Sequence, residues 1–306
     1  MSVTLNDPVA FVGLGVMGRE IAGHLLRAGQ VLRGFDVSTG ALTDFAAAGG
    51  IAYASPADAM RDARFAILLV HNEQQVEEVC FGVDGLASTA TPGSIVWLAS
   101  TVSPGYARHL ARQLELLEVR LLDGPISGGV QRARDGSLSV FLGADPTTAE
   151  DAAELLGRVA DRVFPAGGVG NGSALKLVNQ TLTAANIALT AEAISLAERA
   201  GIPHDVLIDA VNHSAGASAQ FALRAPRMSE RDQTITATVG TFLKDLSIAL
   251  DAADELGSPA PMTTAARDVF AEAGKRGLLS ASDTRLIDVY EHGFDPGRTP
   301  SAARED

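Results

Sequence analysis

The chain has 306 residues, of which 46% are hydrophobic, and its formal net charge is −13. This length suits two domains, and the apolar content allows a large core. The acidic balance disfavours a nucleic-acid-binding protein, which would usually present a basic face. No uncharged apolar run approaches a membrane span, the start of the chain shows no secretion signal, and the single cysteine, Cys80, rules out an internal disulfide. We therefore expect a cytoplasmic protein that binds neither nucleic acid nor membrane.

Short apolar runs alternate with helical stretches in the first half of the chain. The runs predicted as strands are 9–12, 31–36, 65–70, 94–98, 119–122 and 138–142. A helix is predicted over 17–28, and Gly29 ends it. Alternation of strands and helices predicts a mostly parallel sheet with helices on both faces, which is a Rossmann-type α/β domain. Whether the later strands run antiparallel at one edge stays open.

The character of the sequence changes after Phe164-Pro165. A glycine cluster at 167–172 precedes a long helical stretch, 173–200, and the rest is rich in alanine and leucine at helical spacing. We expect a dinucleotide-binding domain over 1–165 and an all-α substrate and oligomerisation domain over 166–306, joined by a long interdomain helix. The polar tail, 295–306, is expected to be flexible.

A glycine-rich turn follows the first predicted strand and opens the first helix. Its six residues are Gly13, Leu14, Gly15, Val16, Met17 and Gly18. In this G-x-G-x-x-G pattern the first glycine permits a tight turn, the second lets backbone approach a pyrophosphate, and the third lets helix and strand pack closely. The helix N-terminus then offers N–H groups and a positive dipole end to phosphates. We interpret the turn as a dinucleotide site; the alternative is a turn used only for packing.

The second predicted strand ends at Asp36, 18 residues after Gly18. Its carboxylate can accept hydrogen bonds from the adenosine ribose hydroxyls and would repel a 2′-phosphate. No arginine adjoins it, and Arg33 lies earlier in the strand. The sequence therefore favours NAD over NADP.

Other strand ends should line the same crevice, because ligands sit beyond the carboxyl ends of parallel strands. The strand 65–70 ends at His71 and Asn72, and the strand 94–98 leads to Ser100 and Thr101. We interpret His71, Asn72 and Thr101 as candidates for the nicotinamide side of the cofactor. His71 as a catalytic base is the less favoured alternative.

A second glycine-rich segment follows a strand at Asp123-Gly124-Pro125. After Ile126, the residues Ser127, Gly128 and Gly129 combine a hydroxyl with bare backbone N–H groups. Such donors suit a substrate carboxylate, because they offer several hydrogen bonds without a full charge. An ordinary turn is the alternative.

Only three of the 24 basic residues are lysines: Lys176, Lys244 and Lys275. Lys176, Asn179, Gln180 and Thr183 share one face of the long helix, among apolar neighbours. This polar face is either solvated surface or the lining of a cleft. In a cleft, burial would lower the lysine pKa toward neutrality and make it a competent acid or base. No cluster of metal-ligand residues is visible, so no metal is expected.

Together these segments resemble the β-hydroxyacid dehydrogenases, the group that contains 3-hydroxyisobutyrate dehydrogenase. The similarity spans about 8–292 and rests on the turn 13–18, the segments 123–136 and 170–180, and Lys244-Asp245-Leu246. The resemblance implies reversible, NAD-dependent oxidation of a small 3-hydroxy carboxylate to a 3-oxo acid or semialdehyde, with Lys176 as general acid and base. It implies that Ser127, Gly128 and Gly129 hold the substrate carboxylate. It also implies that Lys244 and Thr101 contact the cofactor.

Some finer points of the resemblance stay open. The family usually has asparagine four residues after the lysine; here Gln180 holds that position and Asn179 precedes it, so either amide could contact the substrate. The stretch 213–221, with Arg224 and Pro226, is similar to the branch related to L-threonate dehydrogenase. A homodimer or homotetramer is implied.

Two alternative functions differ in class. An imine reductase-like NAD(P)H enzyme uses a related scaffold, but such enzymes typically lack the lysine and prefer NADP, which Lys176 and Asp36 argue against. A non-catalytic NAD-binding scaffold has no need for Lys176 together with Ser127.

Overall fold

The computed structural model describes residues 4–291. Contacts between residues divide the chain into two compact units, Met1–Lys176 and Leu177–Asp306. The predicted tail, 295–306, lies outside the described residues. Among residues 4–291, no helix is both long and apolar enough to cross a membrane.

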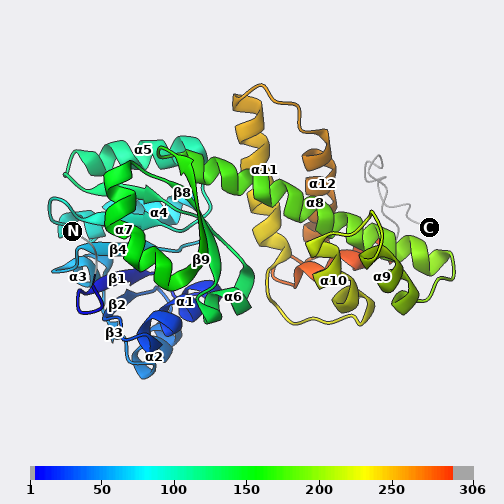
Figure 1. The fold of residues 1–306 in the computed structure, drawn as a ribbon, viewed down its shortest axis with the longest axis horizontal. Helices are drawn as coiled ribbons and strands as arrows, with labels where there is room; N and C mark the ends of the chain where they lie inside the picture. Colours follow the sequence, from blue (N-terminus) through cyan, green and yellow to red (C-terminus); the bar gives the residue numbers. More distant parts are fainter. Residues whose placement is uncertain (1–3, 292–306) are drawn as a thin grey trace, which may run out of the picture. The chain divides into compact units, whose positions relative to one another are not determined.

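The first unit is built on one sheet (Figure 1). Its strands are β1 (Val9–Val12), β2 (Leu32–Phe35), β3 (Ile51–Ala52), β4 (Phe65–Leu68), β5 (Ile95–Leu98), β6 (Arg120–Asp123), β7 (Ile126–Ser127), β8 (Leu138–Gly143) and β9 (Ala160–Gly167). The main path runs β3-β2-β1-β4-β5-β6-β8-β7, and β9 pairs with β8. The first six strands are parallel, whereas β8 is antiparallel to β6 and β7. This confirms the Rossmann-type prediction and shows that one edge does turn antiparallel.

Helices cover both faces of this sheet. They are α1 (Val16–Arg27), α2 (Thr39–Ala47), α3 (Pro56–Met60), α4 (Glu73–Phe81), α5 (Pro104–Glu115), α6 (Gly129–Asp135) and α7 (Pro146–Val159), with a short 3₁₀ turn at Leu86–Ser88. Alternate strand residues such as Phe11 and Ile67 pack against α1, α6 and α7. Their neighbours, such as Val12 and Leu68, pack against α3, α4 and α5. A sheet buried on both faces explains why its central strands are continuous apolar runs.

Several of these helices begin at side-chain caps. Ser103 accepts a hydrogen bond from the backbone of Tyr106 and is followed by proline at the first helical position of α5. Asp145 caps α7 in the same way. Side-chain acceptors satisfy backbone N–H groups at a helix start, and proline there has no N–H to lose. These caps fix where each helix starts relative to the preceding strand.

The strand order reverses between β1 and β4, because β1 pairs with β2 on one side and β4 on the other. In an open parallel sheet, ligands bind beyond the carboxyl ends of the strands at such a reversal. The segments that follow β1, β2, β4 and β5 therefore form the expected cofactor edge.

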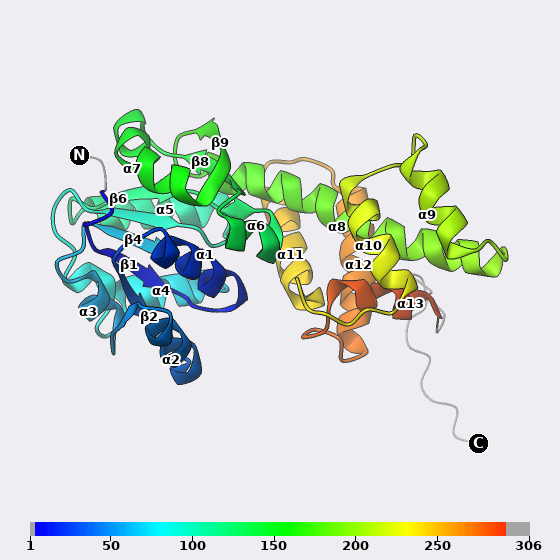
Figure 2. The ribbon, with the colours of Figure 1, turned by 60° about the horizontal axis from the view of Figure 1, so that its bottom comes forward.

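The second unit is helical (Figure 2). It contains most of α8 (Asn171–Arg199), then α9 (His204–Asn212), α10 (Ala219–Ser229), α11 (Val239–Glu255), α12 (Pro261–Lys275), a 3₁₀ turn at Asp283–Leu286 and α13 (Ile287–Glu291). Between Leu177 and Glu291 the structure shows no strand beyond an isolated bridge of Thr238 with Ser282. Its core joins Ile187 and Ile194 of α8 to Phe242 of α11 and Phe270 of α12. This confirms the predicted helical domain and its long helix.

Element bounds differ slightly from the sequence expectations. The second strand begins at Leu32 rather than at residue 31 and ends one residue before Asp36. The long helix begins two residues earlier than predicted, at Asn171. This earlier start has a physical cause, since a side chain from the sheet accepts hydrogen bonds from the first turn of α8.

Candidate active site

The turn between β1 and α1 is tightly packed at two of its three glycines and open at the other. Gly13 has φ +98°, and a Cβ there would lie 2.2 Å from the carbonyl oxygen of Leu69. A Cβ on Gly18 would lie 1.9 Å from the carbonyl oxygen of Gly13. A Cβ on Gly15 would meet no atom within 4 Å, and Gly15 caps α1 with no side-chain hydrogen bond. The first and third glycines are thus required by packing, while the second leaves space for a ligand at the helix N-terminus.

Asp36 lies beside this turn. Its Oδ2 accepts a hydrogen bond from the backbone N–H of Leu14 at 2.6 Å, and its Oδ1 accepts one from Ser38 at 2.8 Å. The carboxylate is thereby fixed at the end of β2, where an adenosine ribose is held in this fold.

Arg33 points its guanidinium elsewhere. It donates to the carbonyl oxygens of Ala59 and Asp58 at 2.9 and 2.7 Å, and it lies 4.2 Å from the ring centre of Tyr53. The arginine nearest to Asp36 in sequence is therefore engaged in structural contacts of the first unit.

The ends of β4 and β5 are joined through Ser100. The backbone N–H of Val70 donates to Ser100 Oγ at 2.9 Å. The side chain of Asn72 accepts from Gln75 N at 2.9 Å and so caps α4, while His71 is exposed. Thr101 is half-buried just beyond β5. Asn72 thus has a structural role that sequence reasoning did not assign to it, and cofactor contacts by His71, Asn72 and Thr101 stay predictions.

The predicted carboxylate loop joins β7 to α6. Ser127 pairs with Ser139 of β8, and its side chain is half-buried. Gly128 and Gly129 have φ +141° and +75°, and a Cβ on Gly129 would meet nothing within 4 Å. Two successive residues in the left-handed region explain the glycine pair and turn the backbone sharply. The loop keeps open space at Gly129.

Beyond this loop, α6 is fastened to α1. Arg134 donates to both carboxylate oxygens of Glu20 at 2.9 and 3.1 Å. Arg27 and His24, also on α1, contact the carbonyl oxygen of Arg134 at 3.0 and 3.1 Å. The helix that follows the glycine turn therefore supports the helix that follows Gly128.

Asp123, at the end of β6, holds the start of α8. Its Oδ2 accepts from the backbone N–H groups of Gly170 and Ser173 at 2.8 and 3.0 Å, and its Oδ1 accepts from Ser173 Oγ at 2.6 Å. Burial raises the pKa of Asp123, while the hydrogen bonds from Ser173, Gly170 and Gly172 act to lower it. Lys176, 7% exposed, follows Ser173 by one helical turn.

The sequence pattern alone assigned no role to Asp123 and did not single out Ser173. The available signal was a carboxylate at the end of an apolar strand, where burial would demand hydrogen-bond donors.

In the second unit, Asp245 joins two of the predicted residues. Gln180 Nε2 donates to Asp245 Oδ2 at 2.7 Å, and Lys244 Nζ lies 2.7 Å from Asp245 Oδ1. Asn179 Nδ2 lies 3.3 Å from Gln180 Oε1 and 3.5 Å from Thr183 Oγ1. Gln180 is 7% exposed and Asp245 2%. The two amides, the lysine and a buried carboxylate thus form one polar network.

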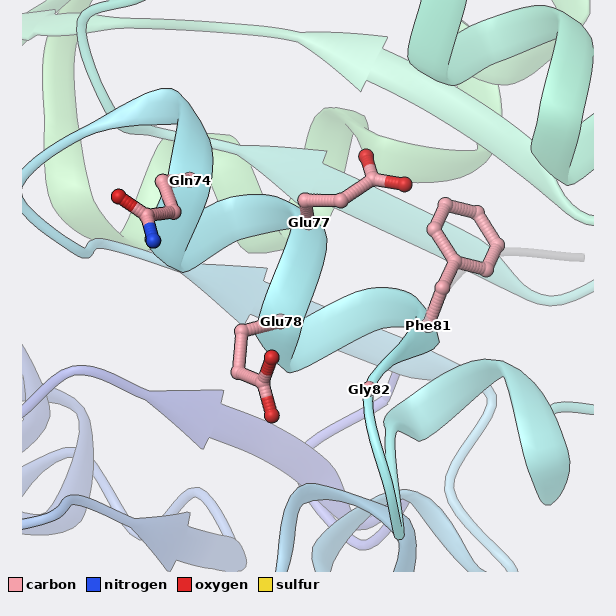
Figure 3. A pocket seen from close by; sticks show the side chains of 5 residues that line it. All are labelled: Gln74, Glu77, Glu78, Phe81 and Gly82. Atoms are coloured by element: carbon pink, nitrogen blue, oxygen red, sulfur yellow. The ribbon is translucent and has the colours of Figure 1, made fainter.

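A pocket elsewhere on the first unit is unsuited to the predicted ligands. It lies along α4 and is lined by Gln74, Glu77, Glu78, Phe81 and Gly82 (Figure 3). Glu77 accepts from the Tyr106 hydroxyl at 3.1 Å. The carboxylates of Glu77 and Glu78 in this pocket would repel a pyrophosphate or the carboxylate of a substrate. Within residues 4–291, no group of three or more His, Cys, Asp and Glu side chains could hold a metal ion.

Comparisons with known proteins agree with this geometry. A family model described as the NAD binding domain of 6-phosphogluconate dehydrogenase matches residues 8–168. A second, described as NAD-binding of NADP-dependent 3-hydroxyisobutyrate dehydrogenase, matches residues 170–290. L-threonate dehydrogenase of Cupriavidus necator is 36% identical over 96% of this chain and 99% of its own length. 3-Sulfolactaldehyde reductase of Escherichia coli is 32% identical over 88% of this chain and 91% of its own length.

Solved structures show the same likeness. A 3-hydroxyisobutyrate dehydrogenase from Salmonella typhimurium is 35% identical, covers 93% of this chain and 100% of its own, and superposes with a TM-score of 0.85. An imine reductase from Streptomyces aurantiacus has a TM-score of 0.64 at 17% identity, with 92% of this chain and 99% of its own covered, a likeness of fold alone. The chain therefore belongs to the β-hydroxyacid dehydrogenase family and is an NAD(P)-dependent hydroxyacid dehydrogenase.

Proposed function

We propose that the protein uses NAD to oxidise a small 3-hydroxy carboxylate reversibly, with Lys176 as the general acid and base. The observation that carries this proposal is the position of Lys176, which is 7% exposed and one helical turn beyond the Asp123-anchored start of α8. A buried lysine can exchange protons, whereas an arginine cannot near neutral pH.

NAD is the proposed cofactor because the residues present fit it. The open space at Gly15 and the tight contacts at Gly13 and Gly18 leave a cradle for a pyrophosphate. Asp36 would accept hydrogen bonds from the ribose hydroxyls, and its negative charge would repel a 2′-phosphate. Arg33, engaged with Ala59 and Asp58, is not directed toward such a phosphate. When bound, NAD accepts or returns the hydride.

The chain's own groups perform the remaining tasks. In oxidation, neutral Lys176 takes the proton of the substrate hydroxyl while a hydride leaves the same carbon, so an alcohol becomes a carbonyl. In reduction, the lysine ammonium returns that proton to the forming hydroxyl. The hydroxyl of Ser127 and the backbone at Gly128 and Gly129 hold the carboxylate.

The network around Asp245 supports separate roles for the two amides. The side-chain N–H of Gln180 donates a hydrogen bond to Asp245 Oδ2, so the Gln180 amide is held from within the second unit. Asn179 lies on the same helix face as Lys176 by helical spacing and is half-buried. We infer that Asn179 contacts the substrate, that Gln180 fixes Asn179, and that Lys244 contacts the cofactor.

A second copy of the chain is the proposed partner. Leu182, Leu189 and Leu196 recur at seven-residue spacing on α8 and are 62%, 51% and 68% exposed. A stripe of leucines at this spacing is the pattern by which helices pair. The protein is therefore proposed to form a homodimer or homotetramer through α8.

A cofactor-coupled screen of the purified protein tests the function. NAD reduction is followed with L-threonate, 3-hydroxyisobutyrate, glycerate and β-hydroxy amino acids, and NADH oxidation with the matching carbonyl compounds. L-Threonate is first in the panel because a relative is named for it. Turnover of a cyclic imine with NADPH, without turnover of any acid, would favour the imine reductase alternative instead.

Substitution of the lysine tests the mechanism. General acid–base catalysis contributes about 10²- to 10⁴-fold, so Lys176→Ala should lose turnover in that range while NADH still binds. Lys275→Ala is the matched control, because the side chain of Lys275 is 74% exposed at the end of α12. Near-normal turnover of Lys176→Ala would refute the assignment.

A further inference from the structure

We infer that Asp123 is a positioning residue: a buried carboxylate at the end of β6 fixes the first turn of α8 and thereby sets the location of the Lys176 amine. The inference rests on the proposed role of Lys176. It adds a residue and a physical link to that role.

The Asp123 carboxylate supplies the negative charge and the hydrogen-bond acceptors that the first turn of α8 lacks. α8 is 29 residues long and has no acidic residue in its first turn. The backbone N–H groups at a helix start need acceptors, and a negative charge there is favourable. Asp123 provides both from another element, since its two oxygens accept from Gly170, Ser173 and the Ser173 hydroxyl. All of these groups donate, which is the arrangement of an ionised carboxylate.

The contact between sheet and helix is close enough to be rigid. A Cβ on Gly172 would lie 2.3 Å from the carbonyl oxygen of Asp123 and 2.5 Å from that of Phe141. A Cβ on Gly143 would lie 2.8 Å from the backbone nitrogen of Gly172 and 3.0 Å from Asp123 Oδ2. Asp123 and Ser173 are both 0% exposed. The start of α8 therefore has little room to shift on β6 and β8.

Two proposed functional segments begin at this point. The chain runs from Asp123 through Pro125 to the loop at Ser127, so the carboxylate also marks the start of the substrate segment. Lys176 lies three residues after Ser173, and helical side chains lean toward the helix N-terminus. Asp123 thus fixes the positions of the Lys176 amine and of the loop at Ser127 relative to the same end of β6. A misplacement of about 1 Å at a reacting group can cost about 100-fold in rate.

Asp123→Asn is the central test. The amide replaces one accepting oxygen by an NH₂ group, which would face a donor. We expect kcat to fall about 100-fold, in line with misplacement of a catalytic group, while the Kd for NADH changes less than about threefold. Ser173→Ala, which removes only the hydroxyl contact, is the milder variant should the first fail to fold. Its kcat should fall about fivefold, as expected for loss of a single hydrogen bond.

Asp145→Asn is the matched control. Asp145 also caps a helix of the first unit, with Thr148 N donating at 3.0 Å, but α7 carries no proposed site residue. It should lower the unfolding temperature and leave kcat unchanged. An Asp123→Asn enzyme with wild-type kcat, or one whose kcat loss is matched by Asp145→Asn, would overturn the inference.

Amide hydrogen exchange separates this inference from the proposed function. Asp123→Asn should speed exchange over residues 170–176, and Asp145→Asn should not. Unchanged exchange there overturns the anchoring role even if the protein oxidises none of the acids. If Asp123→Asn speeds exchange over residues 170–176 but Lys176→Ala keeps wild-type turnover, the proposed catalytic role of Lys176 fails. The expected effect of Asp123 on kcat then fails with it, whereas the anchoring of α8 by Asp123 stands.

Discussion

Asp36→Asn should reduce the preference for NADH over NADPH that we propose for this protein. The carboxylate is held by the N–H groups of Leu14 and Ser38, so its charge is fixed where the ribose 2′ and 3′ positions are proposed to lie. A hydrogen bond to a charged group contributes about 1.5–3 kcal/mol. Losing one such bond should raise the Kd for NADH about tenfold to 100-fold.

The charge itself acts on NADPH. Two like charges about 4 Å apart at an effective dielectric constant near 20 repel by about 4 kcal/mol, an upper bound in the presence of salt. Since 1.4 kcal/mol is about tenfold, the wild-type ratio of the two Kd values should be about 10²–10³, and Asp36→Asn should reduce it by at least about tenfold.

Isothermal titration of wild type and variant with NADH and NADPH measures these ratios without any substrate. Arg33→Lys is the control, because Arg33 contacts Ala59, Asp58 and Tyr53 and should leave the ratio unchanged. Wild-type affinity for NADPH within tenfold of that for NADH, or an unaltered ratio in Asp36→Asn, would show the reasoning to be wrong.

Four further substitutions have defined outcomes. Gly18→Ala places a Cβ 1.9 Å from a backbone oxygen, so it should lower the free energy of unfolding by about 1–3 kcal/mol in thermal unfolding. Gly15→Ala should keep the wild-type unfolding temperature but weaken NADH binding about tenfold. Equal unfolding temperatures for the two variants would contradict the packing argument. Asp245→Asn removes the charged acceptor of Gln180, so it should lower kcat about tenfold and the free energy of unfolding by about 1.5–3 kcal/mol. Unchanged steady-state kinetics would argue against a role of the Asp245 network in catalysis. Leu189→Glu, at a position 51% exposed, should reduce the particle mass measured by light scattering; an unchanged mass would mean that α8 pairs with no second copy.

The parts of the fold with strong periodicity could be predicted from sequence. The central strands are buried on both faces, so they appear in the sequence as apolar runs. The glycine turn is recognisable from the spacing of its three glycines. The strands that sequence reasoning missed are β3, β7 and β9. The first two are two residues long, and β9 is mostly exposed and contains Pro165. Short or exposed strands leave no apolar run to detect.

The site was predicted less evenly. Residues that act through their own backbone conformation, such as Gly13 and Gly128, carry a local signal. Asp123 acts through groups 47 and 50 residues further along, and Gln180 through an acceptor 65 residues away. Nothing in local spacing connects such partners, because their proximity is produced by the packing of the fold.

The long sequence separation at Asp123 has a consequence for how the chain matures. When β6 is made, its terminal carboxylate has no partner until residues 170–173 have been synthesised. A shortened chain that stops at residue 165 would contain β1–β8 but would cut β9 short and would lack the N–H and hydroxyl donors of Asp123. An ionised carboxylate without hydrogen-bond donors is unfavourable wherever it stays buried. Completion of the nucleotide-binding half thus waits for the first turn of a helix that belongs mostly to the other half.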